Sequence, residues 1–297
     1  MGGGLPAFFA GLLPEGHRLT VLRRAAKTSM DDELTLLLAV GSDVPGDVQV
    51  VPEGEPPVTP EPRAGSAAAS LDFAQLAEAP DRHGIPGIQA KASATMLTTR
   101  VHAAGLQAIL KIDPPDYPHL VLNEALHLKA AQALGLTVAT ARVVHDRRDR
   151  AGLLVERFDR VQDDQGSWIR LAREDAAQVM DILPAAKYNV AAEEVVQALS
   201  RVAKAPAVAA RNLYLQFVFA WLTGNGDLHA KNLAVLAGRR GGFVVAPGYD
   251  TPCTALYRDM TLALPVAGKT RNVRARHWEE FAEAIGLPQR AAPTSWP

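Results

Sequence analysis

The spacing of apolar positions divides the chain into a strand-rich segment followed by a mainly helical one. Apolar runs of strand length occupy residues 106–112, 136–144 and 152–155. A helical pattern opens at Asn123 and ends near Gly135, a residue suited to a helix C-terminus. Residues 171–222 have mostly helical spacing and finish in an apolar run at 213–222, which has room for about three helical turns. These patterns predict a β-rich lobe followed by a helical lobe.

A short hairpin and a last helix are predicted in the second half of the chain. Residues 233–236 and 243–246 are typical of two short strands, and a turn rich in glycine and arginine separates them. The last helix carries Trp278, Phe281 and Ile285 on one face and should end near Gly286.

The first part of the chain is predicted to be a small mixed module with a linker after it. Residues 31–40 favour a short helix, and the alternation at 47–51 favours a strand. Residues 52–62 are too rich in proline for a helix or a central strand, so we expect a linker there. The expected organisation is a module at 1–50, a linker at 51–70, an N-terminal lobe at 71–158 and a C-terminal lobe at 159–297.

Composition narrows the class of protein without naming a partner. The 297 residues are 48% hydrophobic and 21% charged, and 31 basic residues balance 32 acidic ones. This balance provides no bulk attraction to nucleic acid or membrane. A single cysteine, Cys253, excludes an internal disulfide framework and fits a reducing cytoplasm. No apolar run approaches the ~20 residues of a membrane span, so a cytoplasmic protein is expected.

The most informative stretch is the loop at 224–232, which follows the apolar run at 213–222. It contains Asp227, His229, Lys231 and Asn232. The interval from Asp227 to Asn232 equals that of the protein-kinase catalytic loop, Asp-x-x-x-x-Asn, and in kinases too a hairpin leads to a metal-binding acid. Here Asp250 stands just past the predicted hairpin. Phosphoryl transfer is therefore the leading hypothesis.

Two charged residues upstream fit the same plan. Lys111 interrupts an apolar strand, where a cation needs a partner, and Glu124 lies in the first turn of the helix that follows. In kinases a strand lysine pairs with a helix glutamate to hold ATP phosphates. The alternatives are a solvent-facing lysine on an edge strand and a glutamate that only complements the helix dipole.

A glycine-containing segment at 83–91 precedes these residues. Its two glycines and Lys91 could wrap phosphates through backbone N–H groups. The segment matches neither the Walker pattern nor the kinase glycine motif, so an ordinary hairpin turn is the alternative.

Taken together, these residues resemble the HipA family, the serine/threonine-kinase toxins of bacterial toxin–antitoxin pairs. The similar motifs lie, in order, at residues 8–16, 87–91, 123–124, 154–160, 174–175, 187–188, 224–232 and 247–250. They extend over nearly the whole chain. The resemblance implies an α+β, two-lobed protein-kinase-like fold with ATP and Mg²⁺ as cofactors.

The resemblance also implies roles for individual residues. Asp227 corresponds to the catalytic acid that positions the attacking hydroxyl and accepts its proton, and Asn232 and Asp250 correspond to the magnesium ligands. Oxygen donors of this kind suit Mg²⁺. The residues implied in ATP binding are Pro86, Gly87, Ile88, Gln89, Ala90, Lys91, Lys111, Glu156, Arg157, Phe158, His229, Ala230, Lys231, Asn232, Tyr249 and Asp250.

Three departures from the family pattern leave three functions open. The module at 1–50 resembles a remnant of the family's N-terminal subdomain, the C-terminal lobe is expected to be shortened, and Gly84 stands where a regulatory serine is expected. One hypothesis is an active kinase whose substrate is a translation component such as an aminoacyl-tRNA synthetase. The other is a catalytically weak module that binds a helix-turn-helix antitoxin, HipB-like, and reaches DNA only through it. A small-molecule phosphotransferase is a third possibility.

Overall fold

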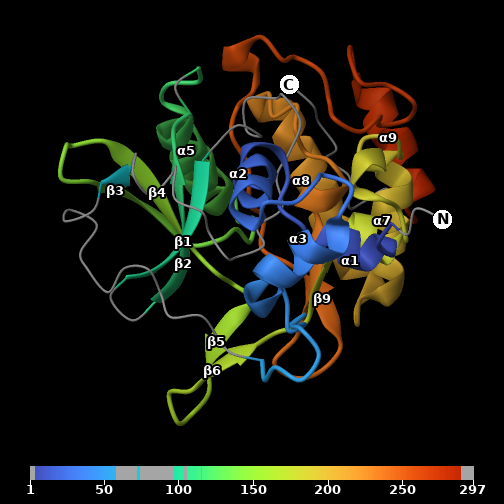
Figure 1. Ribbon diagram of the computed structural model, residues 1–297. Helices are drawn as coiled ribbons and strands as arrows, with labels where there is room; N and C mark the ends of the chain where they lie inside the picture. Colours follow the sequence, from blue (N-terminus) through green and yellow to red (C-terminus); the bar gives the residue numbers. More distant parts are fainter. Residues whose placement is uncertain (1–3, 58–71, 74–96, 104–105, 115, 289–297) are drawn as a thin grey trace.

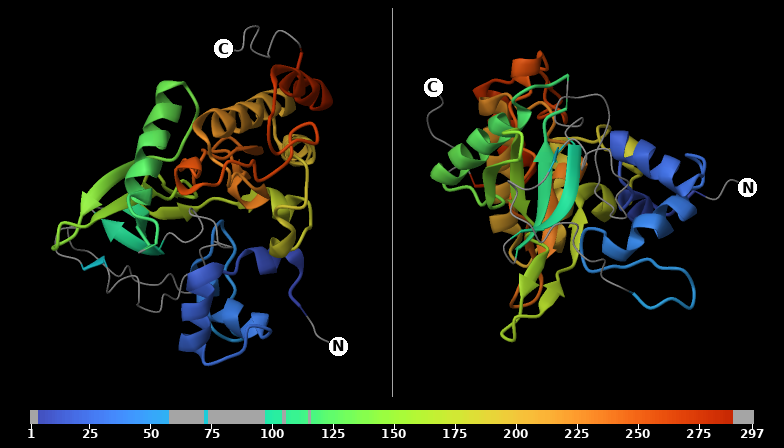
Figure 2. Two further views of the ribbon diagram at one scale, coloured as in Figure 1. Left: turned by 90° about the horizontal axis from the view of Figure 1, so that it is seen from above. Right: turned by 60° about the vertical axis from the view of Figure 1, so that its left-hand side comes forward.

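The computed structural model describes residues 4–57, 72–73, 97–103, 106–114 and 116–288, and these form three groups of elements. A four-stranded antiparallel sheet with one helix makes the N-terminal lobe. Helices with a two-stranded and a three-stranded sheet make the C-terminal lobe. Three short helices from the start of the chain lie against both lobes (Figures 1 and 2). The α+β, two-lobed architecture predicted from the sequence is confirmed.

The sheet of the N-terminal lobe has the strand order β1-β2-β4-β3, with every pair antiparallel. Its strands are β1 (Leu97–Ala103), β2 (Leu106–Ile112), β3 (Ala141–His145) and β4 (Ala151–Glu156). Because β2 lies between β1 and β4, Lys111 is not on an edge strand. The prediction of a strand over 136–144 is partly wrong, because Val138 instead forms an isolated bridge to Gly248 of the other lobe.

Helix α5 (Leu120–Ala133) packs across this sheet. Leu120, Val121 and Leu128 of the helix share a core cluster with Leu153 and Val155 of β4. The helix begins three residues before the predicted start. The cause is a carboxylate outside the helix: Asp113 accepts hydrogen bonds from the backbone N–H groups of His119 and Val121, which satisfies donors that the first helical turn leaves free.

The C-terminal lobe is centred on helix α8. Its elements are β5 (Arg160–Gln162), β6 (Trp168–Arg170), β7 (Arg173–Asp175), α6 (Ala176–Val179), η4 (Pro184–Ala186), α7 (Ala192–Val202), α8 (Pro206–Thr223), η5 (Ala230–Asn232), β8 (Ala234–Ala237), β9 (Phe243–Val245), η6 (Ala255–Tyr257) and α9 (Ala275–Ala284). Phe217 of α8 is buried against Phe281 of α9. The predicted hairpin is confirmed as β8 and β9, and the last helix as α9. Helix α8 is longer than the apolar run because it starts at Pro206, a favourable first residue.

The N-terminal module, residues 4–51, contains α1 (Ala7–Gly11), α2 (Gly16–Ala26), α3 (Glu33–Val40) and η1 (Gly41–Asp43). Its small core includes Leu12, Leu36, Leu37 and Val40. The helix predicted within 31–40 is confirmed, whereas the strand predicted at 47–51 is wrong. That segment contacts η1 through a backbone hydrogen bond from Val50 N–H to Gly41 O and is not paired as a strand, so alternation alone did not make a strand.

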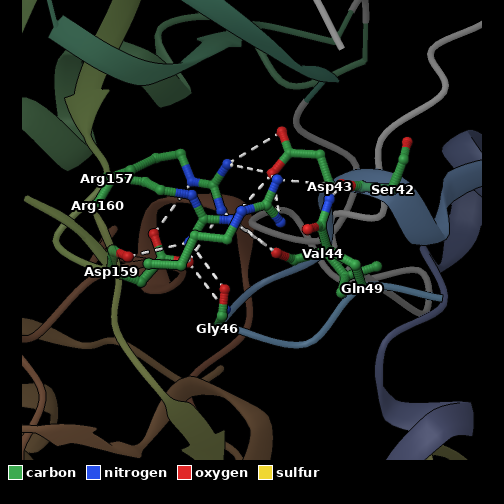
Figure 3. Close-up of polar contacts among 9 residues, drawn as sticks. Ser42, Asp43, Val44, Gly46, Gln49, Arg157, Asp159 and Arg160 are labelled. Atoms are coloured by element: carbon green, nitrogen blue, oxygen red, sulfur yellow. Dashed lines mark hydrogen bonds and ion pairs between the residues drawn. The ribbon is translucent and has the colours of Figure 1, made fainter. Parts of the chain in front are cut away.

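Buried ion pairs join the N-terminal module to the segment after β4 (Figure 3). The Asp43 carboxylate lies 2.9 Å from a guanidinium nitrogen of both Arg157 and Arg160. Asp159 accepts hydrogen bonds from the same two arginines and from the backbone N–H of Gly46. Asp43 of the N-terminal module therefore stabilises the segment that connects the two lobes through its ion pairs with Arg157 and Arg160.

We expect Asp159→Asn to destabilise the fold by about 3–5 kcal/mol at neutral pH, because it leaves buried guanidinium groups short of a counter-charge. Burial by itself would raise the pKa of the Asp159 carboxyl, but Arg157 and Arg160 hold that pKa well below its usual 3.8. A depressed carboxylate pKa stabilises the fold above pH 3.8, and this contribution is lost as the pH falls through the folded-state pKa. Urea unfolding across pH should therefore show the wild-type advantage shrinking in acid. The exposed Asp164→Asn is the matched control, and an equal loss in both variants would contradict the prediction.

No helix in the described part of the chain is long and apolar enough to cross a bilayer.

Candidate active site

The 224–232 loop leaves α8 at Gly224 and is held by its own side chains. The Asn225 amide oxygen accepts the Asp227 N–H at 2.9 Å, and the Asn232 amide donates to the Asp227 carbonyl at 2.9 Å. The Gly226 N–H donates to the Thr254 hydroxyl at 2.7 Å. A Cβ at Gly226 would lie 2.4 Å from the Thr261 carbonyl oxygen, so this position requires glycine. The loop is thus fixed around Asp227.

Asp227 is completely buried, and one of its carboxylate oxygens accepts a hydrogen bond from the Tyr188 hydroxyl at 2.8 Å. Burial and the neighbouring Asp227 charge both raise the pKa of Tyr188, so the phenol remains a donor. The buried ring of His229 packs edge-on against Tyr188, with centroids 5.0 Å apart. These contacts fix the direction of the carboxylate that the sequence assigns to proton acceptance.

Lys111 joins the two lobes through its ammonium group. Its Nζ lies 2.6 and 2.9 Å from the two carboxylate oxygens of Glu124 on α5 and also pairs with Asp250 of the C-terminal lobe. Burial alone would lower the pKa of Lys111, but Asp250 and Glu124 outweigh it and raise that pKa. The prediction that Lys111 pairs with Glu124 is confirmed, and the alternative of a solvent-facing lysine is wrong.

Glu124 is fully buried, so the alternative of a surface charge on the helix dipole is also wrong. Burial raises the pKa of its carboxyl, and the nearby Asp250 charge adds to that rise, while Lys111 opposes it. Asp250 itself has a left-handed backbone, with φ of 51°, and its carbonyl accepts from Asn225 at 3.3 Å. Asn225 therefore connects Asp227 to Asp250.

Asn232 and Asp250 each offer an oxygen donor of the kind that a magnesium ion binds. Asn232 uses its amide nitrogen to hold the Asp227 carbonyl, which leaves its amide oxygen as a ligand donor. The Asp250 carboxylate is a quarter exposed and supplies further oxygens. Within the described ranges, no three His, Cys, Asp or Glu side chains form a metal-binding group, so such a site would depend on the Asn232 oxygen. Hard oxygen donors of this type are what Mg²⁺ prefers.

Tyr249 and Lys231 are joined by a hydrogen bond, but their side chains have different partners. The Tyr249 hydroxyl donates to the Lys231 carbonyl at 2.8 Å and accepts from Arg173, and burial raises its pKa to about 12. The Lys231 ammonium lies 2.7 Å from Glu15 and 3.0 Å from the Gly11 carbonyl, both in the N-terminal module. Its contact with ATP phosphate stays a prediction, and that contact requires the ammonium to exchange partners. Ala230 is buried beside it and bonds through its N–H to the Lys187 carbonyl.

The segment predicted to meet adenine, residues 156–158, begins at the last residue of β4. The N–H groups of Glu156 and Arg157 donate to Thr140 and Gln107 within the protein. An adenine contact would therefore use the backbone carbonyl oxygens of this segment and the side chain of Phe158. The Arg157 side chain forms ion pairs with Asp43 and Asp159. Phe158 packs on Tyr249 with ring centroids 5.6 Å apart, which places the segment beside Asp250.

The predicted phosphate loop cannot be placed with these residues. Pro86, Gly87, Ile88, Gln89, Ala90 and Lys91 lie outside the described residues.

Four residues contact the site but were not predicted as site residues. They are Tyr188, Asn225, Thr254 and Glu15. Tyr188 and Glu15 both stand in motifs that carry the family resemblance, so they could have been singled out. Their partners, however, are distant along the chain.

A two-lobed fold, with a lysine–glutamate pair in one lobe and an Asp-x-x-x-x-Asn loop in the other, defines a protein-kinase-like protein. The chain belongs to the HipA family: residues 83–295 match the HipA-like C-terminal domain, and residues 1–51 match the HipA N-terminal domain.

Relatives agree with this assignment. Y4mE of Sinorhizobium fredii is 29% identical, over 95% of this chain and 73% of its own length. The serine/threonine-protein kinase toxin HipA of Shewanella oneidensis is 26% identical, over 95% of this chain and 71% of its own. A solved structure of HipA from S. oneidensis, in complex with HipB and operator DNA, has a TM-score of 0.78 at 22% identity. It covers 97% of this chain and 74% of that one. This last likeness shows a shared fold.

Proposed function

We propose that this protein is an ATP- and Mg²⁺-dependent kinase that transfers the γ-phosphate to a serine or threonine hydroxyl of a protein. The observation that carries the proposal is the position of Lys111. Its buried ammonium meets Glu124 of one lobe and Asp250 of the other, next to the loop that holds Asp227. A cation fixed between two acids at a lobe junction is the arrangement that phosphoryl transfer needs for phosphate binding.

Each residue then has a defined part in the reaction. Lys111 binds an ATP phosphate, and Asn232 and Asp250 would hold the magnesium ion. The ion, when bound, neutralises phosphate charge. Asp227 orients the acceptor hydroxyl and takes its proton as the oxygen bonds to the γ-phosphorus. The bond from that phosphorus to the bridging oxygen breaks, and ADP leaves. Tyr188 keeps the Asp227 carboxylate aimed at the acceptor.

The family also suggests the protein's partners. The S. oneidensis relative was solved with HipB and operator DNA. We propose that this chain likewise binds a helix-turn-helix antitoxin and meets DNA only through it. We further propose a cytoplasmic protein substrate of the translation apparatus, such as an aminoacyl-tRNA synthetase. The module at 1–50, the linker at 51–70 and the lobes at 71–158 and 159–297 remain our proposed division of the chain.

The test is phosphate transfer by the purified protein. With Mg²⁺ and γ-labelled ATP we expect label on serine or threonine of the protein itself or of a lysate protein, and none when the metal is chelated. A thermal shift with Mg²⁺ and ATP measures nucleotide binding separately, since a ligand of the folded form raises its melting temperature. Binding without transfer would contradict the kinase and favour the antitoxin-binding module. If the protein shows neither nucleotide binding nor phosphate transfer, ATP is not its cofactor and the kinase proposal is contradicted.

A further inference from the structure

A carboxylate of the N-terminal module lies between two lysines of the C-terminal lobe. One oxygen of Glu15 is 2.5 Å from the Lys187 ammonium, and the other is 2.7 Å from the Lys231 ammonium. The lysine side chains are only 2% and 3% exposed. The carbonyl of Gly11, in the same module, accepts from Lys231 at 3.0 Å. The N-terminal helices lie alongside this part of the C-terminal lobe (Figure 2).

The charge of Glu15 is maintained by these two lysines. Burial alone would raise the pKa of its carboxyl, but Lys231 and Lys187 lower it. Buried ammonium groups are costly unless they are paired and hydrogen-bonded. Asp175, fully buried nearby, also attracts Lys231, but burial raises the pKa of that carboxyl. Glu15 is thus the counter-charge that both lysines share.

Both lysines are directly connected to the candidate site. Lys231 immediately precedes the proposed magnesium ligand Asn232 in the 224–232 loop. Lys187 precedes Tyr188, whose hydroxyl holds Asp227 at 2.8 Å. The Lys187 carbonyl also accepts the N–H of Ala230 at 3.2 Å. The single carboxylate of Glu15 therefore contacts both the 224–232 loop, through Lys231, and the segment that supports Asp227, through Lys187.

We propose that Glu15 is a positioning residue of the phosphotransfer site, through which the N-terminal module holds Asp227 and Asn232 in place. This inference rests on the proposed kinase function. It makes the N-terminal module part of the working enzyme, acting through Lys187 and Lys231. The alternative is that Glu15 only attaches the N-terminal module to the C-terminal lobe. That alternative predicts a lower stability of the fold without a specific effect on the 224–232 loop.

The experiment compares Glu15→Gln with Glu33→Gln. The control removes a carboxylate from the same module, where Glu33 accepts a hydrogen bond from the Leu5 N–H at 2.8 Å, a contact within that module. In Glu15→Gln we expect kcat to fall about 10- to 100-fold, because small displacements of reacting groups cost rates of this order. The control should keep kcat close to wild type. Melting curves establish that both variants are folded at the assay temperature.

Hydrogen exchange supplies a readout that does not depend on activity. Amides of residues 226–233 and 187–190 should exchange faster in Glu15→Gln than in wild type, and those in Glu33→Gln should not. If Glu15→Gln does not fold, Glu15→Gln/Lys187→Met, which leaves one buried ammonium fewer, takes its place with the same expectation.

Unchanged loop exchange and unchanged kcat in a folded Glu15 variant would overturn the positioning role. Absence of phosphate transfer by the wild type would instead overturn the proposed function. In that case the exchange comparison still decides whether Glu15 positions the loop.

Discussion

Asp227→Asn should reduce phosphate transfer by about 10²- to 10⁴-fold while leaving the protein folded and able to bind Mg²⁺ and ATP. A positioned general base typically contributes this much to a rate. The substitution keeps the shape of the side chain and an oxygen that can still accept from the Tyr188 hydroxyl, so the surrounding contacts survive. The change removes only the capacity to take the hydroxyl proton.

Labelled-phosphate assays and nucleotide-induced thermal shifts, measured on the same preparations, check this prediction. Asp164→Asn is the matched control, because Asp164 is exposed and belongs to the turn between β5 and β6. Equal transfer by wild type and Asp227→Asn would assign the labelling to another group or to a contaminating kinase. A loss of transfer together with a loss of nucleotide binding would mean that Asp227 supports the fold of the site.

Lys111→Met should reduce transfer by about 10²- to 10³-fold, the effect typical of losing one preorganised group that stabilises developing charge. It should also weaken the ATP-induced thermal shift, because the same ammonium is proposed to bind phosphate. The variant leaves Glu124 buried without its cation, and burial already raises the pKa of that carboxyl. Some loss of stability is therefore expected beside the loss of activity.

A second variant separates these two effects. Lys111→Met/Glu124→Gln removes the unpaired acid, so it should recover stability in urea unfolding and stay inactive. Lys129→Met on the exposed face of α5 is the control and should behave like wild type. Recovery of activity in the double variant would show that Lys111 serves the fold and has no direct part in phosphate binding.

The sequence predicted much of the fold where short-range pattern and tertiary packing agree. The β8–β9 hairpin, α9 and the strand that carries Lys111 occur as expected. The segment at 47–51 is not a strand, although its residues alternate. A strand needs a second strand to pair with, and alternation does not show whether one is present. The early start of α5 was missed because Asp113, outside the apolar pattern, accepts the first N–H groups of the helix.

By itself, the sequence predicted the site residues of the 224–232 loop, because the Asp227-to-Asn232 spacing is local, and it predicted the HipA family, because motifs that resemble the family recur along the chain. Apart from the predicted Lys111–Glu124 pair, only the tertiary structure decided which charges meet. Lys111 reaches Asp250 across 139 positions of sequence, and Glu15 reaches Lys187 across 172. A buried charge requires a counter-charge, but the sequence does not say which one. The folding of both lobes and the N-terminal module selects the partner, and it places Glu15 between Lys187 and Lys231.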